Sequence, residues 1–142
     1  MNMSLEENKA IVMQLIEGID RADFSVFDRV CSIGLRAHFM GTALNREQIE
    51  AASRKFSEAF ADIRHRIQDV IAEGDRVAVR AVDEVTHSGQ FQGIPPTKRH
   101  VSFEMIAIYR IQDGKIAEIW EQMDRDGLCS NNSERDLKSY VP

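Results

Sequence analysis

The sequence predicts an α+β fold, in which helices from the first half of the chain cover one face of a curved antiparallel or mixed sheet formed by the second half. Apolar residues recur at helical spacing before position 60, and they alternate with polar residues after position 63. The dipeptides Gly74-Asp75 and Asp113-Gly114 separate the alternating runs and favour tight turns between strands. A sheet that curls around helices leaves a concave, mostly apolar pocket, where small ligands bind.

Helices are expected over residues 5–20, from Asp23 onward for a short stretch, and over roughly 46–60. The first and third of these begin at capping boxes, Ser4-Leu5-Glu6-Glu7 and Asn45-Arg46-Glu47-Gln48, in which each end residue caps the backbone near the other. Behind both boxes the apolar residues fall on one helical face. In the third helix this stripe consists of Ile49, Ala52, Phe56 and Phe60.

Strands are expected at 35–40, 63–72, 76–87, 100–112 and 115–124. Asp113-Gly114 joins the last two as a hairpin, because a two-residue type I′ turn needs positive φ at both positions. Residues 89–97 contain Pro95-Pro96 and are expected to form a loop, and the polar tail after Leu128 is expected to be partly loose.

The length of 142 residues favours a single domain with one core, spanning residues 1–142. The net charge is −5, which argues against binding of nucleic acid or of an anionic membrane surface. No run of about 18 apolar residues predicts a membrane span, and the N-terminus lacks a signal-peptide pattern, so a cytoplasmic protein is expected. Cys31 and Cys129 are far apart and are expected to be reduced thiols.

Several spaced segments of the second half are similar to one known family. They are 60–63 (FADI), 70–80 (VIAEGDRVAVR), 86–91 (THSGQF), 93–97 (GIPPT), 108–111 (IYRI), 113–116 (DGKI) and 118–128 (EIWEQMDRDGL). In this order they resemble the SnoaL-like polyketide cyclase family of the NTF2-like superfamily. The resemblance implies an NTF2-like cone, which is a sheet wrapped around a hydrophobic pocket, and a homodimer or higher homo-oligomer. It also implies cofactor-free ring closure on a polyketide ester by intramolecular aldol condensation.

Asp124 is the first candidate catalytic residue, because the resemblance implies that the Asp of Trp120-x-x-x-Asp124 acts as acid and base. Such a carboxylate needs an apolar pocket that raises its pKa toward neutrality. The alternative is a solvated Asp at a strand end. His38 is the second candidate, because it follows a short strand where it can reach a substrate carbonyl or orient a water. A purely structural histidine is the alternative there.

Further residues are expected around the substrate. His87 ends a strand and can line the pocket mouth, and Arg80, if it points inward, needs a partner such as Glu104. The alternative for Arg80 and Glu104 is an ion pair on the outer face. Trp120 is a candidate aromatic wall beside Asp124, and Tyr109 a candidate donor to an enolate oxygen. Pocket wall or core is expected for Phe56, Phe60, Phe91 and Met105.

Other residues are not expected to carry chemistry. His65 and His100 lie next to arginines and are expected at the surface. The four scattered histidines show no metal-ligand spacing, so neither a metal nor a cofactor is expected.

Three functions compete on this evidence. The first is a cofactor-free lyase or isomerase of the polyketide cyclase type, acting on a small hydrophobic molecule such as a polyketide-like ester or aromatic. The second is a related isomerase or an epoxide hydrolase, in which Asp83 and Arg80 supply partners for a water. The third is a non-catalytic ligand-binding or dimerisation module, because fold alone does not determine function.

Overall fold

The computed structural model describes residues 4–91 and 93–124. In chain order the elements are α1 (Leu5–Asp20), α2 (Val26–Val30), β1 (Cys31–Phe39), β2 (Thr42–Asn45), α3 (Arg46–Ala59), β3 (Phe60–Glu73), β4 (Arg76–His87), β5 (His100–Gln112) and β6 (Lys115–Met123). None of the described helices is long and apolar enough to cross a membrane.

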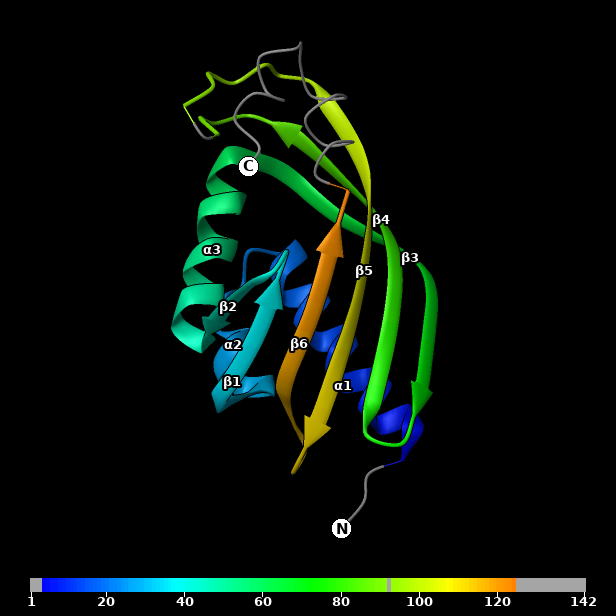
Figure 1. Cartoon of the computed structure of the whole chain (residues 1–142). Helices are drawn as coiled ribbons and strands as arrows, with labels where there is room; N and C mark the ends of the chain where they lie inside the picture. The colour runs from blue at the N-terminus through cyan, green and yellow to red at the C-terminus, as the bar shows by residue number, and fades with distance from the viewer. Residues whose placement is uncertain (1–3, 92, 125–142) are drawn as a thin grey trace.

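The strands form one curved six-stranded sheet in the order β2-β1-β6-β5-β4-β3. The β1–β6 pair is parallel and the other pairs are antiparallel, so the sheet is mixed. Figure 1 shows α1 and α2 behind the sheet and α3 alongside the edge that carries β2. The α+β prediction, with N-terminal helices against a curved sheet, is confirmed.

Local signals in the sequence account for most of the element boundaries. The Ser4 hydroxyl accepts a hydrogen bond from the Glu7 backbone N–H at 3.1 Å, and Asn45 caps Gln48 in the same way at 2.8 Å. Asp113 and Gly114 both have positive φ, 51° and 75°, which confirms the turn expected between β5 and β6.

The sequence does not predict β2, and it places the starts of two strands too late. β2 has four residues and follows a tight turn at Met40 and Gly41, where φ is 53° and 87°. β1 begins at Cys31, directly after α2. The sequence does not reveal this start, because Ile33 and Gly34 are both exposed and interrupt the alternation of buried and exposed residues. β3 begins at Phe60 rather than at residue 63. The sequence places the start too late because Phe60 also continues the apolar helical stripe of α3.

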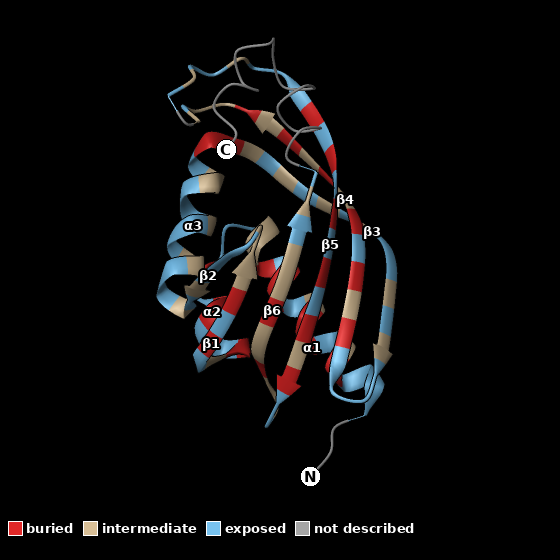
Figure 2. Cartoon of the chain, in the orientation of Figure 1, coloured by how far each residue is buried: buried red, intermediate tan, exposed pale blue. Residues whose placement is uncertain are grey.

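The register of β4 decides which side chains face the helices. β4 pairs with β5 without interruption from Arg76↔Arg110 to Thr86↔His100, so no bulge reverses its alternation. Every second residue is therefore buried, and Figure 2 shows this as red bands along β4 and β5. The buried row of β4 consists of Val77, Val79, Ala81, Asp83, Val85 and His87.

The crossing of α1 over α2 depends on Gly18. A Cβ atom added to Gly18 would lie 2.7 Å from the Cβ atom of Val26, whose side chain is fully buried. Gly18→Ala is therefore expected to lower the free energy of unfolding by about 1–3 kcal/mol through overpacking. Urea denaturation would measure this, with Gly34→Ala as the matched control, because a Cβ at Gly34 meets nothing within 4 Å. Equal stability of the two variants would contradict the tight crossing.

Candidate functional site

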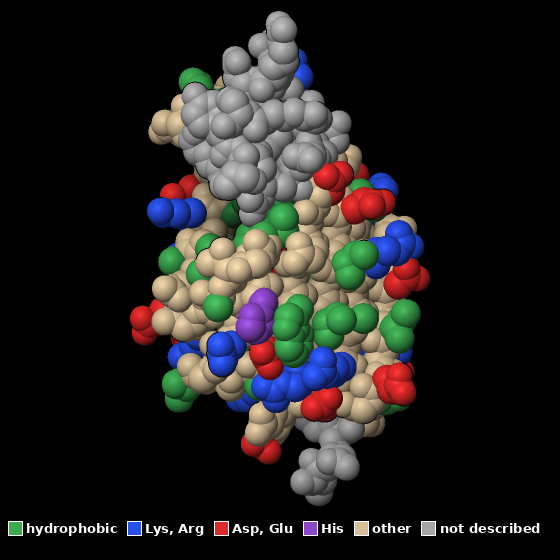
Figure 3. Space-filling view, in the orientation of Figure 1, with side chains coloured by type: hydrophobic (Ala, Val, Ile, Leu, Met, Phe, Trp, Pro, Cys, Tyr) green, Lys and Arg blue, Asp and Glu red, His purple; other side chains and the backbone are tan. Residues whose placement is uncertain are grey.

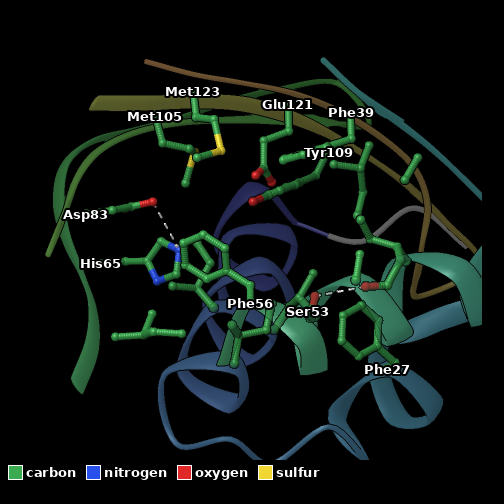
Figure 4. Close-up of a pocket in the computed structure, with 18 of the residues that line it drawn as sticks. Phe27, Phe39, Ser53, Phe56, His65, Asp83, Met105, Tyr109, Glu121 and Met123 are labelled. Atoms are coloured by element: carbon green, nitrogen blue, oxygen red, sulfur yellow. Dashed lines mark hydrogen bonds and ion pairs between the residues drawn. The ribbon is translucent and has the colours of Figure 1, made fainter. Parts of the chain in front are cut away.

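A cavity of about 170 Å³ lies between α1, α3 and the inner face of the sheet. Most of its lining is apolar, which is the environment that perturbs the pKa of any titratable group within it. Figure 4 shows side chains from several strands pointing into this space. The apolar lining includes Leu15, Ile19, Phe56, Phe103, Met105 and Met123.

Each of four neighbouring strands contributes one titratable side chain to the cavity. These are His65 from β3, Asp83 from β4, Tyr109 from β5 and Glu121 from β6. Each occupies an inward position of its strand, as Asp83 does between Ala81 and Val85. His65 and Asp83 are also direct cross-strand partners. Sheet register therefore gathers groups that are far apart in the sequence.

Asp20, the last residue of α1, orients the His65 ring. The Asp20 carboxylate accepts from the His65 backbone N–H at 3.2 Å and lies 2.5 Å from Nδ1. This contact leaves Nε2 facing Asp83, whose Oδ2 is 3.6 Å away. Burial alone lowers the pKa of His65, but the hydrogen bond to Asp20 and the negative charges of Asp83, Asp20 and Glu121 raise it overall. His65 is thus held toward its charged form between two carboxylates.

The two carboxyl groups of the cavity have pKa values close to neutrality. Burial raises the pKa of Asp83 to about 6, the positive charge of His65 opposes this, and Asp20 adds to it. Burial likewise raises the pKa of Glu121 to about 7, with His65 opposing and Asp83 adding to the shift. Groups with such values can both accept and release protons near neutral pH.

Tyr109 remains a hydrogen-bond donor throughout the physiological range. Its side chain is almost fully buried, and this burial, followed by the negative charge of Glu121, raises its pKa well above the ordinary value. Figure 4 shows its hydroxyl pointing toward the Glu121 carboxyl group. A phenol in this position can donate to an oxygen of a bound ligand.

Residues 9–131 match the family model described as SnoaL-like polyketide cyclase. The chain belongs to the SnoaL-like polyketide cyclase family. This confirms the resemblance drawn from the spaced segments of the second half. A comparison with curated protein sequences found no match.

Several solved structures share the fold of this SnoaL-like chain over most of its length. AclR from Streptomyces galilaeus, proposed to be a hydroxylase, is 26% identical with a TM-score of 0.85, covering 98% of this chain and 100% of its own. IdmH from Streptomyces antibioticus, proposed to be a polyketide cyclase, is also 26% identical, with a TM-score of 0.80 and coverage of 87% and 96%. A SnoaL-like protein from Jannaschia sp. CCS1 has a TM-score of 0.84 at 24% identity, covering 94% and 97%.

Asp124, to which the family resemblance assigns acid/base catalysis, does not line the cavity. It follows the end of β6, its side chain is exposed, and its backbone N–H donates to the Glu104 carbonyl at 2.8 Å. Alternation in β6 sends Ile119, Glu121 and Met123 into the cavity instead. A catalytic role of Asp124 stays a prediction.

His38 borders the cavity, but its ring is engaged elsewhere. His38 Nε2 lies 2.7 Å from a carboxylate oxygen of Glu118, and the ring stacks on Trp120 with centroids 5.5 Å apart. Neither Glu118 nor Trp120 lines the cavity. Hydrogen bonds to His38 and Arg110 lower the pKa of Glu118, so this carboxylate is charged. Trp120 is therefore not an aromatic wall of the cavity.

Arg80 and Glu104 do not pair with each other, so that prediction is wrong. The register places Arg80 opposite Ile106 and Glu104 opposite Val82. Arg80 Nε donates instead to Asp69 at 2.7 Å, in an exposed ion pair outside the cavity. The Asp83–Arg80 set considered for an epoxide hydrolase is therefore not assembled around the cavity.

His87, Phe60 and Phe91 form an aromatic cluster outside the cavity lining. His87 is fully buried, its Nδ1 accepts from the Thr97 backbone N–H at 3.2 Å, and its ring lies 5.2 Å from that of Phe60. None of the three lines the cavity. Phe56 stacks on Phe60 and also lines the cavity, as do the predicted residues Tyr109 and Met105.

The interpretation of His65 as a surface residue is wrong, because its side chain is only 13% exposed. His65 lies in the same row of β3 as Ile63 and Ile67 and alternates with the exposed Arg64 and Arg66, and this alternation is the signal that could have placed it inside. Asp83 stands in the Val-rich row of β4 in the same way. His100 is exposed, as expected.

The outer face of the sheet carries exposed apolar side chains, and Figure 3 shows them gathered beside charged groups. They include Ile71, Ile106 and Ile108. The homodimer or higher oligomer expected from the sequence stays a prediction.

Reactive groups also include the cysteines and the possible metal-binding side chains. Cys31 is a free, buried thiol, and burial raises its pKa to about 12. Cys129 lies outside the described residues. Within residues 4–91 and 93–124, no group of three or more His, Cys, Asp or Glu side chains is arranged to hold a metal ion.

Proposed function

We propose that this SnoaL-like protein is a cofactor-free enzyme that performs acid/base chemistry on a hydrophobic carbonyl compound bound in the cavity. The observation that carries the proposal is the meeting of His65, Asp83, Tyr109 and Glu121 in an otherwise apolar space. Membership of the family supports it, and so does the likeness to IdmH, which is itself proposed to be a polyketide cyclase.

Asp83 is the proposed general base. With a pKa of about 6 it is mostly ionised at pH 7, yet it is far more basic than an exposed aspartate. It takes the proton from a carbon next to a carbonyl, and the electron pair of that C–H bond forms an enolate. In ring closure the enolate carbon bonds to a second carbonyl carbon of the same molecule, whose C=O π electrons move to oxygen.

Glu121 and Tyr109 are the proposed donors to the oxygen that gains charge. Glu121, with a pKa of about 7, is protonated in a large share of molecules at neutral pH and can supply a proton to the new alkoxide. Tyr109 can hydrogen-bond the enolate oxygen. Such donors act strongly in a site that excludes water, because the local dielectric constant is low.

His65 is the proposed positioning residue for the base. Asp20 holds its ring so that Nε2 faces the Asp83 carboxylate. The charged imidazole therefore favours ionised Asp83 before the reaction. In this scheme His65 acts through Asp83 and does not touch the reacting carbon.

Hydrogen–deuterium exchange at the carbon next to a ketone tests this proposal without knowledge of the natural substrate. A panel of neutral aromatic ketones such as 2-tetralone would be titrated into the protein, and the binders would be incubated with it in D₂O near pD 7. We expect the protein to accelerate loss of the C–H signal, measured by ¹H NMR, above the buffer rate. Glu73→Gln, which alters an exposed carboxylate of β3, is the control expected to remain active. Binding without exchange by every ketone would instead support the non-catalytic ligand-binding alternative.

A further inference from the structure

We infer that the cavity selects neutral or positively charged ligands that carry an N–H or O–H donor, and that it rejects anions. The donor binds Asp83, and an apolar body occupies the remaining space. This inference rests on the same cavity as the proposed function and specifies its substrate class, but it concerns binding rather than turnover.

Charge is distributed unevenly around the cavity. Asp83 and Glu121 line it, and Asp20 contacts the His65 ring from behind. Among the described lining residues, none is Lys or Arg. Two histidines line the cavity, but the His38 ring contacts Glu118, so His65 is the base that lies against these carboxyl groups. A carboxylate or phosphate group on a ligand would meet like charges in a region of low dielectric constant, where repulsion is poorly screened. The cavity is therefore unfavourable for anions.

Asp83 has one oxygen that lacks a partner. Its Oδ2 faces His65 Nε2, whereas Oδ1 is buried and accepts no hydrogen bond from the described residues. The residue is only 6% exposed, so bulk water has little access to that oxygen. A buried acceptor without a donor costs free energy, and a ligand N–H or O–H would recover it. Figure 4 shows the Asp83 side chain entering the cavity beside His65.

The space next to Asp83 suits a flat apolar group. Val85, Phe103 and Met105 line the cavity from β4 and β5, and Phe56 lines it from α3. Aromatic rings pack well against phenylalanine, and methionine adapts to irregular shapes. A compound with an aromatic ring and one donor group therefore matches both the apolar lining and the free acceptor of Asp83.

A matched series of small aromatics tests the inference. Benzylamine, benzyl alcohol, toluene and benzoate share one ring and differ in charge and in donor capacity. Each would be titrated into ¹⁵N-labelled protein at pH 7, and dissociation constants would be taken from amide shifts. We expect benzylamine and benzyl alcohol to bind at least about tenfold more tightly than benzoate, because each can donate a hydrogen bond to Asp83 whereas the negative charge of benzoate is repelled.

Variants of Asp83 show whether the preference arises there. Asp83→Val continues the apolar row of β4 and removes the acceptor, so the advantage of benzyl alcohol over toluene should disappear. Asp83→Asn keeps an acceptor without charge, so it should lose most of the preference for benzylamine and retain that for benzyl alcohol. Glu73→Gln should leave every constant unchanged.

Three results would overturn the inference. These are benzoate binding as tightly as benzylamine, no binding of either donor compound, and an unchanged preference in Asp83→Val. Failure here is distinguishable from failure of the proposed function. Charge-selective binding without ketone exchange contradicts the catalysis alone, and exchange without charge selectivity contradicts the inference alone.

Discussion

Asp83→Asn is expected to slow protein-catalysed ketone exchange by about 10²–10⁴-fold, because an amide cannot accept a proton at neutral pH. The substitution preserves the shape of the side chain, so binding of a neutral ketone should change little. The rate of C–H loss in D₂O, compared with that of Glu73→Gln, measures the effect. If Asp124→Asn abolishes exchange and Asp83→Asn does not, the base is Asp124, as the family resemblance implies.

Asp83→Asn is also expected to be more stable than the wild type at high pH. The pKa of Asp83 is about 6 in the folded protein against an ordinary 3.8, so the folded state favours the protonated form. That stabilisation is complete below pH 3.8 and is lost as the pH rises through about 6. The difference between these two pKa values corresponds to a destabilisation of the folded state by about 3 kcal/mol at pH 8, where Asp83 is ionised. Asparagine carries no charge, so Asp83→Asn removes this destabilisation.

Urea denaturation at pH 4.5 and pH 8 would measure this difference. We expect Asp83→Asn to exceed the wild type in unfolding free energy clearly at pH 8 and by less at pH 4.5. Gain of stability with loss of exchange is the signature of a functional group held in an unfavourable environment. Loss of stability at both pH values would indicate that Asp83 is a structural partner of His65.

The second large effect is a bell-shaped dependence of the exchange rate on pH. The rate should fall below about pH 6, where the base Asp83 becomes protonated, and above about pH 7, where Glu121 loses its proton. Because the two carboxyl groups influence each other, the limbs describe the pair rather than either residue alone. The maximum should therefore lie between pH 6 and 7.

Glu121→Gln separates the two limbs. Glutamine can donate a hydrogen bond but cannot transfer a proton, so the alkaline limb should vanish and the maximal rate should fall by at least about tenfold. Rates measured from pH 5 to 9 on the wild type, Glu121→Gln and Glu73→Gln test this. An alkaline limb that persists in Glu121→Gln would assign it to another group, such as His65.

Features that depend on a few neighbouring residues were predictable from the sequence. The capping boxes at Ser4 and Asn45, the Asp113-Gly114 turn and the alternation of β4 are such features, and all are present. Their geometry arises within one turn or one strand, where backbone hydrogen bonding and side-chain sterics act locally. Phe56 and Met105 were expected as pocket wall or core and Tyr109 as a hydrogen-bond donor, and all three line the cavity.

The polar centre of the site was not predictable in the same way. His65 and Glu121 come together through the register of different strands, and Asp20 reaches His65 from the end of α1, 45 residues earlier in the chain. The neighbouring arginines suggested that His65 is exposed. The alternation of β3 puts His65 on one face of the sheet, but the sequence does not show that helices cover that face and bury it. Motif resemblance drew attention to Asp124, whereas β6 presents Glu121 to the cavity.

The sequence by itself determined the α+β class, the position of most elements and the family of this protein. The periodicity of apolar residues, the helix caps and the turns each depend on a few neighbouring residues, so they can be recognised directly in the sequence. Only the tertiary structure decided which carboxylates line the cavity. Their pKa values depend on burial and on nearby charges from other helices and strands. The register of β3 with β4 and the packing of α1 against β3 determine both the burial and the positions of these charges.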